Sequence, residues 1–146
     1  MAKYLAIKTN DIDNGPGLRV SVWFSGCPHE CNGCHNKECW NKELGKEFTD
    51  ETINKIIEFL DGDIKQDLSI LGGEPLAPYN IQSCIKLINE VRKRLPNTKI
   101  WLWTGYDIEE VVFLEPTYGD IKADVIVDGK YIKSLHINDK YRGSSN

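Results

Sequence analysis

The sequence predicts an α/β fold in which a mostly parallel, curved sheet carries helices on its outer face. Short runs of β-branched and aromatic residues alternate with segments whose apolar residues recur at helical spacing. This strand, loop and helix pattern repeats about four times, which favours parallel strands. A closed eight-stranded barrel needs about 250 residues, and the chain has 146. We therefore expect a single domain, residues 1–146, built as an open, partial (β/α) barrel.

The expected elements can be placed in chain order. Strands are predicted at 3–8 and 18–24, and the turn-forming residues 14–17 lie between them. Residues 37–48 look irregular, and a helix follows Thr49, whose side chain suits an N-cap. Further strands are predicted at 68–71, 99–104 and 125–127, and further helices at 81–95 and 107–114, with Asn80 and Asp107 as N-caps.

Some side chains have predicted places within these elements. Cys84 falls on the apolar stripe of the helix at 81–95, so we expect it to pack in the core. Trp101 and Trp103 point to one side of their strand, and core packing is expected for at least one. Thr104 and Tyr106, at the carboxyl end of that strand, are better placed to contact a ligand.

Composition and charge exclude several classes of protein. The chain is 40% hydrophobic and 27% charged, as is ordinary for a soluble globular domain. Its net charge of −4 does not indicate a basic surface of the kind that binds nucleic acid. No apolar run approaches the roughly 18 residues of a membrane span, and the N-terminus lacks a signal-peptide pattern, so we expect a cytoplasmic protein that does not bind membranes.

The most informative stretch is a cluster of cysteines that follows the second predicted strand. Cys27, Cys31 and Cys34 have the spacing C-x3-C-x2-C, and in a reducing compartment such a cluster indicates metal binding rather than disulfides. Four-iron clusters usually take four cysteines, so three would leave one iron open for chemistry. Two alternatives stay open: a structural zinc site completed by His29 or His35, and a closed electron-transfer cluster completed by Cys39.

A second motif follows the strand predicted at 68–71. Gly72 and Gly73 would let the backbone approach a ligand closely, and Glu74 would offer an acceptor to a cationic group. The alternative is a tight turn between strand and helix, with Pro75 ending the strand.

Together, and in this order, the two motifs resemble those of the radical S-adenosylmethionine superfamily. Within it, the chain looks like the activating proteins of anaerobic ribonucleoside-triphosphate reductases. The resemblance covers nearly the whole chain through residues 14–17, 25–36, 72–76, 101–106, 127–130 and 142–146. Two departures are Gly33, where the wider superfamily usually has an aromatic residue before the third cysteine, and the chain's end at Asn146, a few residues earlier than in the family. The role of the tail 142–146 is therefore left open.

The resemblance implies a cofactor set and a reaction. The residues it assigns are Cys27, Cys31 and Cys34 as ligands of a 4Fe–4S cluster, Gly72, Gly73 and Glu74 around the amino group of S-adenosylmethionine, and Gly33, Cys34 and His35 along its adenosyl side. A donor such as flavodoxin would reduce the cluster, and reductive cleavage of the cofactor would give a 5′-deoxyadenosyl radical. That radical would take hydrogen from a glycine in the catalytic subunit of the reductase, forming a glycyl radical. The cofactors carry this chemistry, so no catalytic acid or base is implied.

Alternatives remain for the function and for single residues. The protein could activate another glycyl-radical enzyme, such as pyruvate formate-lyase, or be a non-enzymatic electron-transfer or zinc-binding module. For His29 we favour a hydrogen bond near the iron ligands, or a solvent-facing position, over iron ligation. The family pattern does not require a cysteine at position 39, so we do not expect Cys39 to be a fourth ligand. Residues 14–17 either shape the mouth of the site or form only a turn.

Overall fold

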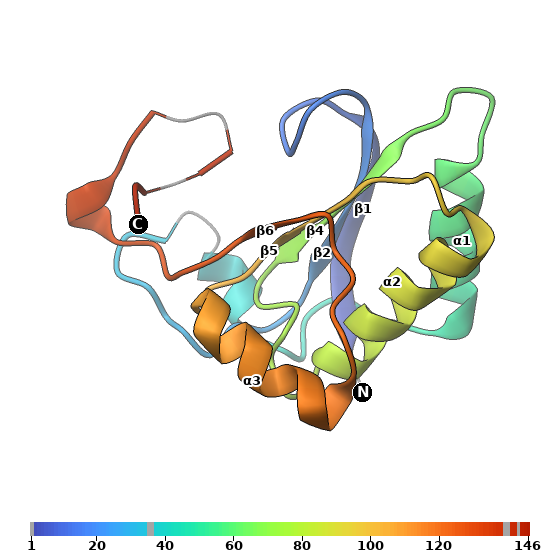
Figure 1. The fold of residues 1–146 in the computed structure, drawn as a ribbon. Coiled ribbons are helices and arrows are strands. Elements are labelled where there is room, and N and C mark those ends of the chain that lie inside the picture. Colours follow the sequence, from blue (N-terminus) through green and yellow to red (C-terminus); the bar gives the residue numbers. More distant parts are fainter. Residues whose placement is uncertain (1, 35–36, 139–140, 143) are drawn as a thin grey trace.

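The computed structural model describes residues 2–34, 37–138, 141–142 and 144–146 (Figure 1). Its elements are strands β1 (Lys3–Asp11), β2 (Arg19–Phe24), β3 (Lys46–Glu47), β4 (Asp67–Gly72), β5 (Ile100–Trp103) and β6 (Val125–Val127), helices α1 (Asp50–Leu60), α2 (Ile81–Arg94) and α3 (Ile108–Tyr118), and the 3-10 turns η1 (Lys37–Trp40) and η2 (Lys133–Leu135).

The strands form one mixed sheet with the order β3-β1-β2-β4-β5-β6. Strands β2, β4, β5 and β6 run parallel, while β1 is antiparallel to both β2 and β3. The segment between β1 and β2 is too short for a crossover helix, so these two strands can pair only in antiparallel fashion. The fold is thus α/β with a mixed sheet, and its curvature into a partial barrel of the radical S-adenosylmethionine type stays a prediction.

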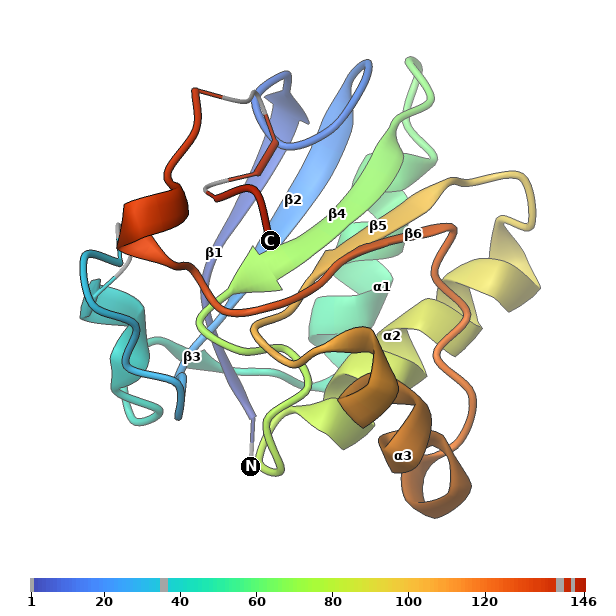
Figure 2. The same ribbon diagram turned by 60° about the vertical axis from the view of Figure 1, so that its left-hand side comes forward.

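The helices pack against one face of the sheet, as two views show (Figures 1 and 2). In the central strands every second side chain points to this face, and all of them are apolar and fully buried: Val20, Val22, Phe24, Leu68, Ile70, Ile100 and Leu102. Cys84 of α2 is also fully buried in this core, which confirms its predicted place. This apolar layer between the helices and the sheet holds the strands in place, and it thereby positions the loops at their carboxyl ends.

Several boundaries differ from the sequence prediction. Residues 37–48, predicted irregular, contain η1 and the edge strand β3. Helix α3 continues past residue 114 to Tyr118 with Pro116 inside it. Because proline has no backbone N–H, the last turn of α3 lacks the hydrogen bond that residue 116 would otherwise donate to residue 112. Asn80 occupies the N-cap position of α2 but makes no capping hydrogen bond.

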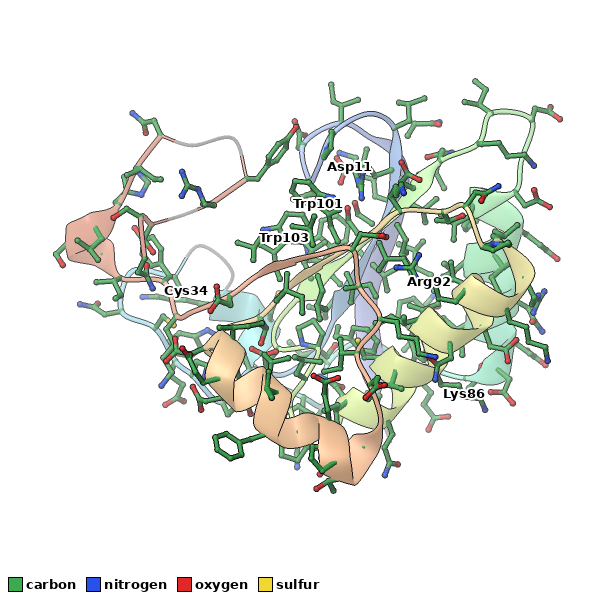
Figure 3. The ribbon with its side chains drawn as sticks, viewed as in Figure 1. Asp11, Cys34, Lys86, Arg92, Trp101 and Trp103 are labelled. Carbon is green, nitrogen blue, oxygen red and sulfur yellow. The ribbon has the colours of Figure 1, made fainter. Side chains whose placement is uncertain are left out.

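The opposite face of the sheet is polar and aromatic. Trp101 and Trp103 lie there, with ring centroids 5.6 Å apart, and both are only half-buried. The prediction that at least one of them packs in the core is therefore wrong, because the helix-facing positions of β5 belong to Ile100 and Leu102. Figure 3 shows both indoles on the side of the C-terminal segment, and the Trp103 Nε1 donates to the carbonyl oxygen of Tyr141.

A buried polar network pins the loop at 12–18 to this polar face. The Arg19 guanidinium is 1% exposed and donates to Ser69 Oγ at 2.8 Å and to the carbonyl oxygens of Pro16 and Leu68. The pKa of Arg19 is lowered by burial, although the nearby Asp67 carboxylate raises it. Residues 14–17 are thereby held as an ordered turn against β4.

Candidate functional site

The cysteine loop, the Gly72–Gly73–Glu74 turn and the end of β5 lie together. They leave the carboxyl ends of three parallel, neighbouring strands, β2, β4 and β5, which is where ligands bind in α/β sheets. Backbone hydrogen bonds join the first two segments: Gly73 N donates to the Phe24 oxygen at 3.0 Å and Glu74 N donates to the Gly26 oxygen at 2.7 Å. The arrangement brings the two sequence motifs into contact.

The glycines of the turn are required by this contact. Gly72 has φ +127°, in the region that favours glycine. A Cβ on Gly73 would lie 2.3 Å from the Gly26 oxygen and 2.9 Å from the Cys39 oxygen. The close approach that the sequence suggested for a ligand is made here by the backbone of the cysteine loop.

The side chains of the three motif cysteines are half-buried. The pKa of Cys27 is raised to about 11, chiefly by burial and to a lesser extent by the neighbouring charges of Glu74 and Cys31. Within the described residues, no three His, Cys, Asp or Glu side chains are gathered closely enough to hold a metal ion. The donor chemistry nevertheless suits iron, because thiolates are the ligands of iron–sulfur clusters. Binding would require these thiols to converge and release their protons.

Cys39 is buried next to the site rather than exposed in it. It belongs to η1, is 4% exposed, and its carbonyl oxygen accepts from Gly26 N at 2.6 Å. Its backbone thus supports the start of the cysteine loop.

Glu74 is fully buried and its carboxylate accepts four hydrogen bonds. One oxygen accepts from His29 Nε2 at 2.7 Å and from Gly105 N at 2.6 Å. The other accepts from Thr104 Oγ1 at 2.8 Å and from Leu76 N at 2.9 Å. Both predicted ligand contacts at the end of β5 are therefore engaged with protein: Thr104 with Glu74, and Tyr106 with the ring of His29 in a T-shaped contact.

His29 makes a hydrogen bond beside the cysteines, as expected, and its side chain is 5% exposed, so the solvent-facing alternative is wrong. Its ring centroid lies 4.6 Å from that of Tyr106. A Cβ on Gly105 would come within 2.4 Å of the His29 ring, so the ring needs a glycine at that position. Burial raises the pKa of Tyr106, and the Glu74 charge raises it further.

A cavity of about 340 Å³ opens beside the cysteine loop. Its lining includes His29, Cys31, Gly105, Asp107, Glu110, Lys130, Tyr131, Ile132 and Asn146. None of the described residues predicted to contact the cofactor is among them, and Gly33 instead faces Tyr131 and Lys133. His35 lies outside the described residues.

Comparisons with known proteins agree on one family. Residues 13–146 match the family described as a 4Fe-4S single cluster domain. The chain is 41% identical over 136 residues to the anaerobic ribonucleoside-triphosphate reductase-activating protein of Enterobacteria phage T4, covering 93% of this chain and 85% of that protein. The identically named protein of Escherichia coli K12 is 42% identical, with 93% and 90% covered, and that of Haemophilus influenzae 36% identical, with 98% and 94% covered.

The chain belongs to the anaerobic ribonucleoside-triphosphate reductase-activating protein family. Both sequence motifs fall within the region shared with this family and with the single-cluster domain. In the part of the chain that the structure describes, the helices are all too short or too polar to cross a membrane.

Sequence reasoning missed one residue that joins the two motifs of this family member. Asn80 is 1% exposed, and its Nδ2 donates to the Ser25 oxygen at 2.8 Å and to the Glu74 oxygen at 3.0 Å. An asparagine before a helix is ordinarily a cap, so the sequence carried no signal that it would bridge two loops. The cavity-lining residues Asp107 and 130–132 were also missed, because they are distant in sequence from the cysteines.

Proposed function

We propose that this protein activates an anaerobic ribonucleoside-triphosphate reductase through a 4Fe–4S cluster and S-adenosylmethionine. The observation that carries the proposal is the C-x3-C-x2-C loop at the carboxyl end of β2, in a chain similar to the activating proteins over 93% of its length. When bound, the cluster and S-adenosylmethionine would supply the chemistry: cleavage of the cofactor by one electron from the cluster, giving methionine and a 5′-deoxyadenosyl radical that would take a hydrogen atom from a glycine of the reductase.

The chain's own residues bind and orient these groups. Cys27, Cys31 and Cys34 would provide three thiolates, one fewer than the four cysteines that usually bind a four-iron cluster, so one iron would have no protein ligand. The adjacent cavity of about 340 Å³ is within the size range of small-molecule sites. Its carboxylates Asp107 and Glu110 are acceptors suited to hydroxyl or amino groups.

The partner must reach this cavity, because the proposed substrate is a glycine within another protein. In the described sheet order, β3 and β6 stand at opposite ends. We propose that the sheet acts as a partial barrel whose open side admits a peptide segment of the catalytic subunit. An electron donor such as flavodoxin would dock near the same loop, since electron transfer needs proximity to the cluster.

The test is reconstitution with iron and sulfide without oxygen, followed by addition of reductant and S-adenosylmethionine. We expect 5′-deoxyadenosine and, when the catalytic subunit is present, a glycyl radical detected by electron paramagnetic resonance. Omission of the subunit is the control that separates cofactor cleavage from activation.

Each other outcome selects a different function. Cleavage without a radical on the reductase would redirect the search to another glycyl-radical enzyme. A full cluster without cleavage would favour an electron-transfer module. A colourless, zinc-loaded protein would overturn the cluster assignment.

A further inference from the structure

The carboxylate of Glu74 has no hydrogen-bonding capacity left for a ligand in this arrangement. A carboxylate offers about four lone-pair directions, and protein donors occupy four: the His29 ring, Gly105 N, Thr104 Oγ1 and Leu76 N. Because Glu74 is 0% exposed, an ammonium group could reach it only by displacing one of these donors. The geometry thus indicates a role inside the protein.

These donors come from separate parts of the chain. His29 belongs to the cysteine loop, Leu76 to the turn that follows β4, and Thr104 and Gly105 to the end of β5. A carboxylate that accepts from all of them ties the cysteine loop to two strand ends. Since the loop carries the thiols, its position depends on this buried anion.

His29 transmits that position to Cys27. Its side chain is held by the Glu74 carboxylate, by the backbone at Gly105 and by the ring of Tyr106, and it stands two residues after Cys27 in the cysteine loop. The next residue, Glu30, has φ +48°. A non-glycine residue keeps such a backbone only where its surroundings enforce it.

We propose that Glu74 and His29 act as one positioning pair that holds the cysteine loop in place beside Cys27, and that Glu74 does not bind the amino group of the cofactor. The inference rests on the proposed function, since it concerns a cluster ligand. The reduction potential of a cluster depends on the surroundings of its cysteine ligands, so a pair that positions the Cys27 loop would influence the cluster although neither side chain touches iron.

The test is a double-mutant cycle with His29→Phe, Glu74→Gln and the combination. On the reconstituted protein we expect both single variants to shift the cluster's midpoint potential and paramagnetic spectrum in one direction, and the double variant to add little. The affinity for S-adenosylmethionine, measured by equilibrium dialysis, should change by less than about threefold. His29→Gln, which keeps a donor near the Nε2 position, should restore much of the wild-type spectrum.

A different result overturns the inference. If Glu74→Gln weakens cofactor binding by more than about tenfold while His29→Phe does not, Glu74 is a cofactor ligand. Additive effects on the potential would likewise contradict the coupled pair.

A metal-free measurement separates this inference from the proposed function. In the apo protein, His29→Phe and Gly105→Ala should both speed hydrogen exchange at residues 27–34, because each removes the His29 ring from its place. Gly62→Ala is the matched control, since its Cβ would meet only ordinary contacts, the nearest at 3.6 Å. Unchanged exchange in both site variants would refute the positioning role, whether or not the protein cleaves the cofactor.

Discussion

The Trp103 indole donates a 2.8 Å hydrogen bond to the carbonyl oxygen of Tyr141, which lies far along the chain. The Tyr141 ring also contacts Trp101 in a T-shaped arrangement, with centroids 5.4 Å apart. Through these contacts the C-terminal segment covers part of the sheet face that the helices leave free, as Figure 2 shows.

We expect Trp103→Phe to loosen the C-terminal segment while the core stays folded. The variant keeps an aromatic ring but loses the donor, which should lower the free energy of unfolding by about 1 kcal/mol. Hydrogen exchange should accelerate in the described residues of 130–146. Trp23→Phe in β2 makes the same chemical change in another strand of the sheet and serves as the control. Equal exchange in both variants would contradict the importance of the bond to Tyr141.

The cysteine variants should separate ligands from structural thiols. We expect Cys27→Ala, Cys31→Ala and Cys34→Ala each to lose nearly all reconstituted iron and all cofactor cleavage, because a three-thiolate site cannot spare a ligand. Cys39→Ala and Cys84→Ala remove buried core thiols, so they should lower stability by about 1 kcal/mol and retain iron. Iron loss in Cys39→Ala would support the closed-cluster alternative, and full cleavage in any motif variant would exclude that cysteine as a ligand.

Replacement of Arg19 should be among the most destabilising changes outside the site. Arg19→Met leaves acceptors on Ser69, Pro16 and Leu68 without their donor. We expect a loss of about 2–4 kcal/mol in urea unfolding.

The matched control for this prediction is Arg94→Met on α2. Its guanidinium pairs with Glu90 at 3.8 Å, and both side chains are substantially exposed. That change should cost less than about 1 kcal/mol. Similar losses in the two variants would show that burial of the Arg19 network contributes little.

Asp124 should make stability depend on pH. Burial raises the pKa of this carboxyl, but hydrogen bonds from Arg92 and from Ile100 N outweigh burial, so the net pKa is lowered. A lowered folded-state pKa gives stability that is present above the unfolded-state value of about 3.9 and is lost as pH falls through the folded value. We therefore expect Asp124→Asn to destabilise the protein by about 1–2 kcal/mol at pH 7 and by progressively less below pH 4.

The control for the pH dependence is Asp120→Asn, an exposed position in the same connection between α3 and β6. Its unfolding free energy should follow the wild type across the same pH range. An Asp124→Asn penalty that stays constant down to low pH would contradict an ionic origin.

The sequence by itself determined the elements and the chemical motifs. Alternating apolar residues marked β2, β4 and β5, helical spacing marked α1 and α2, and the cysteine spacing marked the site, because these signals are local. It did not determine the direction of β1 or the short strand β3, which depend on pairing between segments. It likewise predicted core packing for at least one of Trp101 and Trp103, because period-two patterning defines two faces of a strand without showing which face the helices cover.

Only the tertiary structure decided what the motif residues contact. The sequence specifies the carboxylate of Glu74 but does not show whether it belongs to a turn, binds a ligand or accepts hydrogen bonds inside the protein. Its role depends on the donors His29 and Thr104, which are far away in sequence. Asn80 became a bridge rather than a cap for the same reason. Spacing along the chain specifies which groups are available, whereas the packing of parallel strand ends specifies which of them meet.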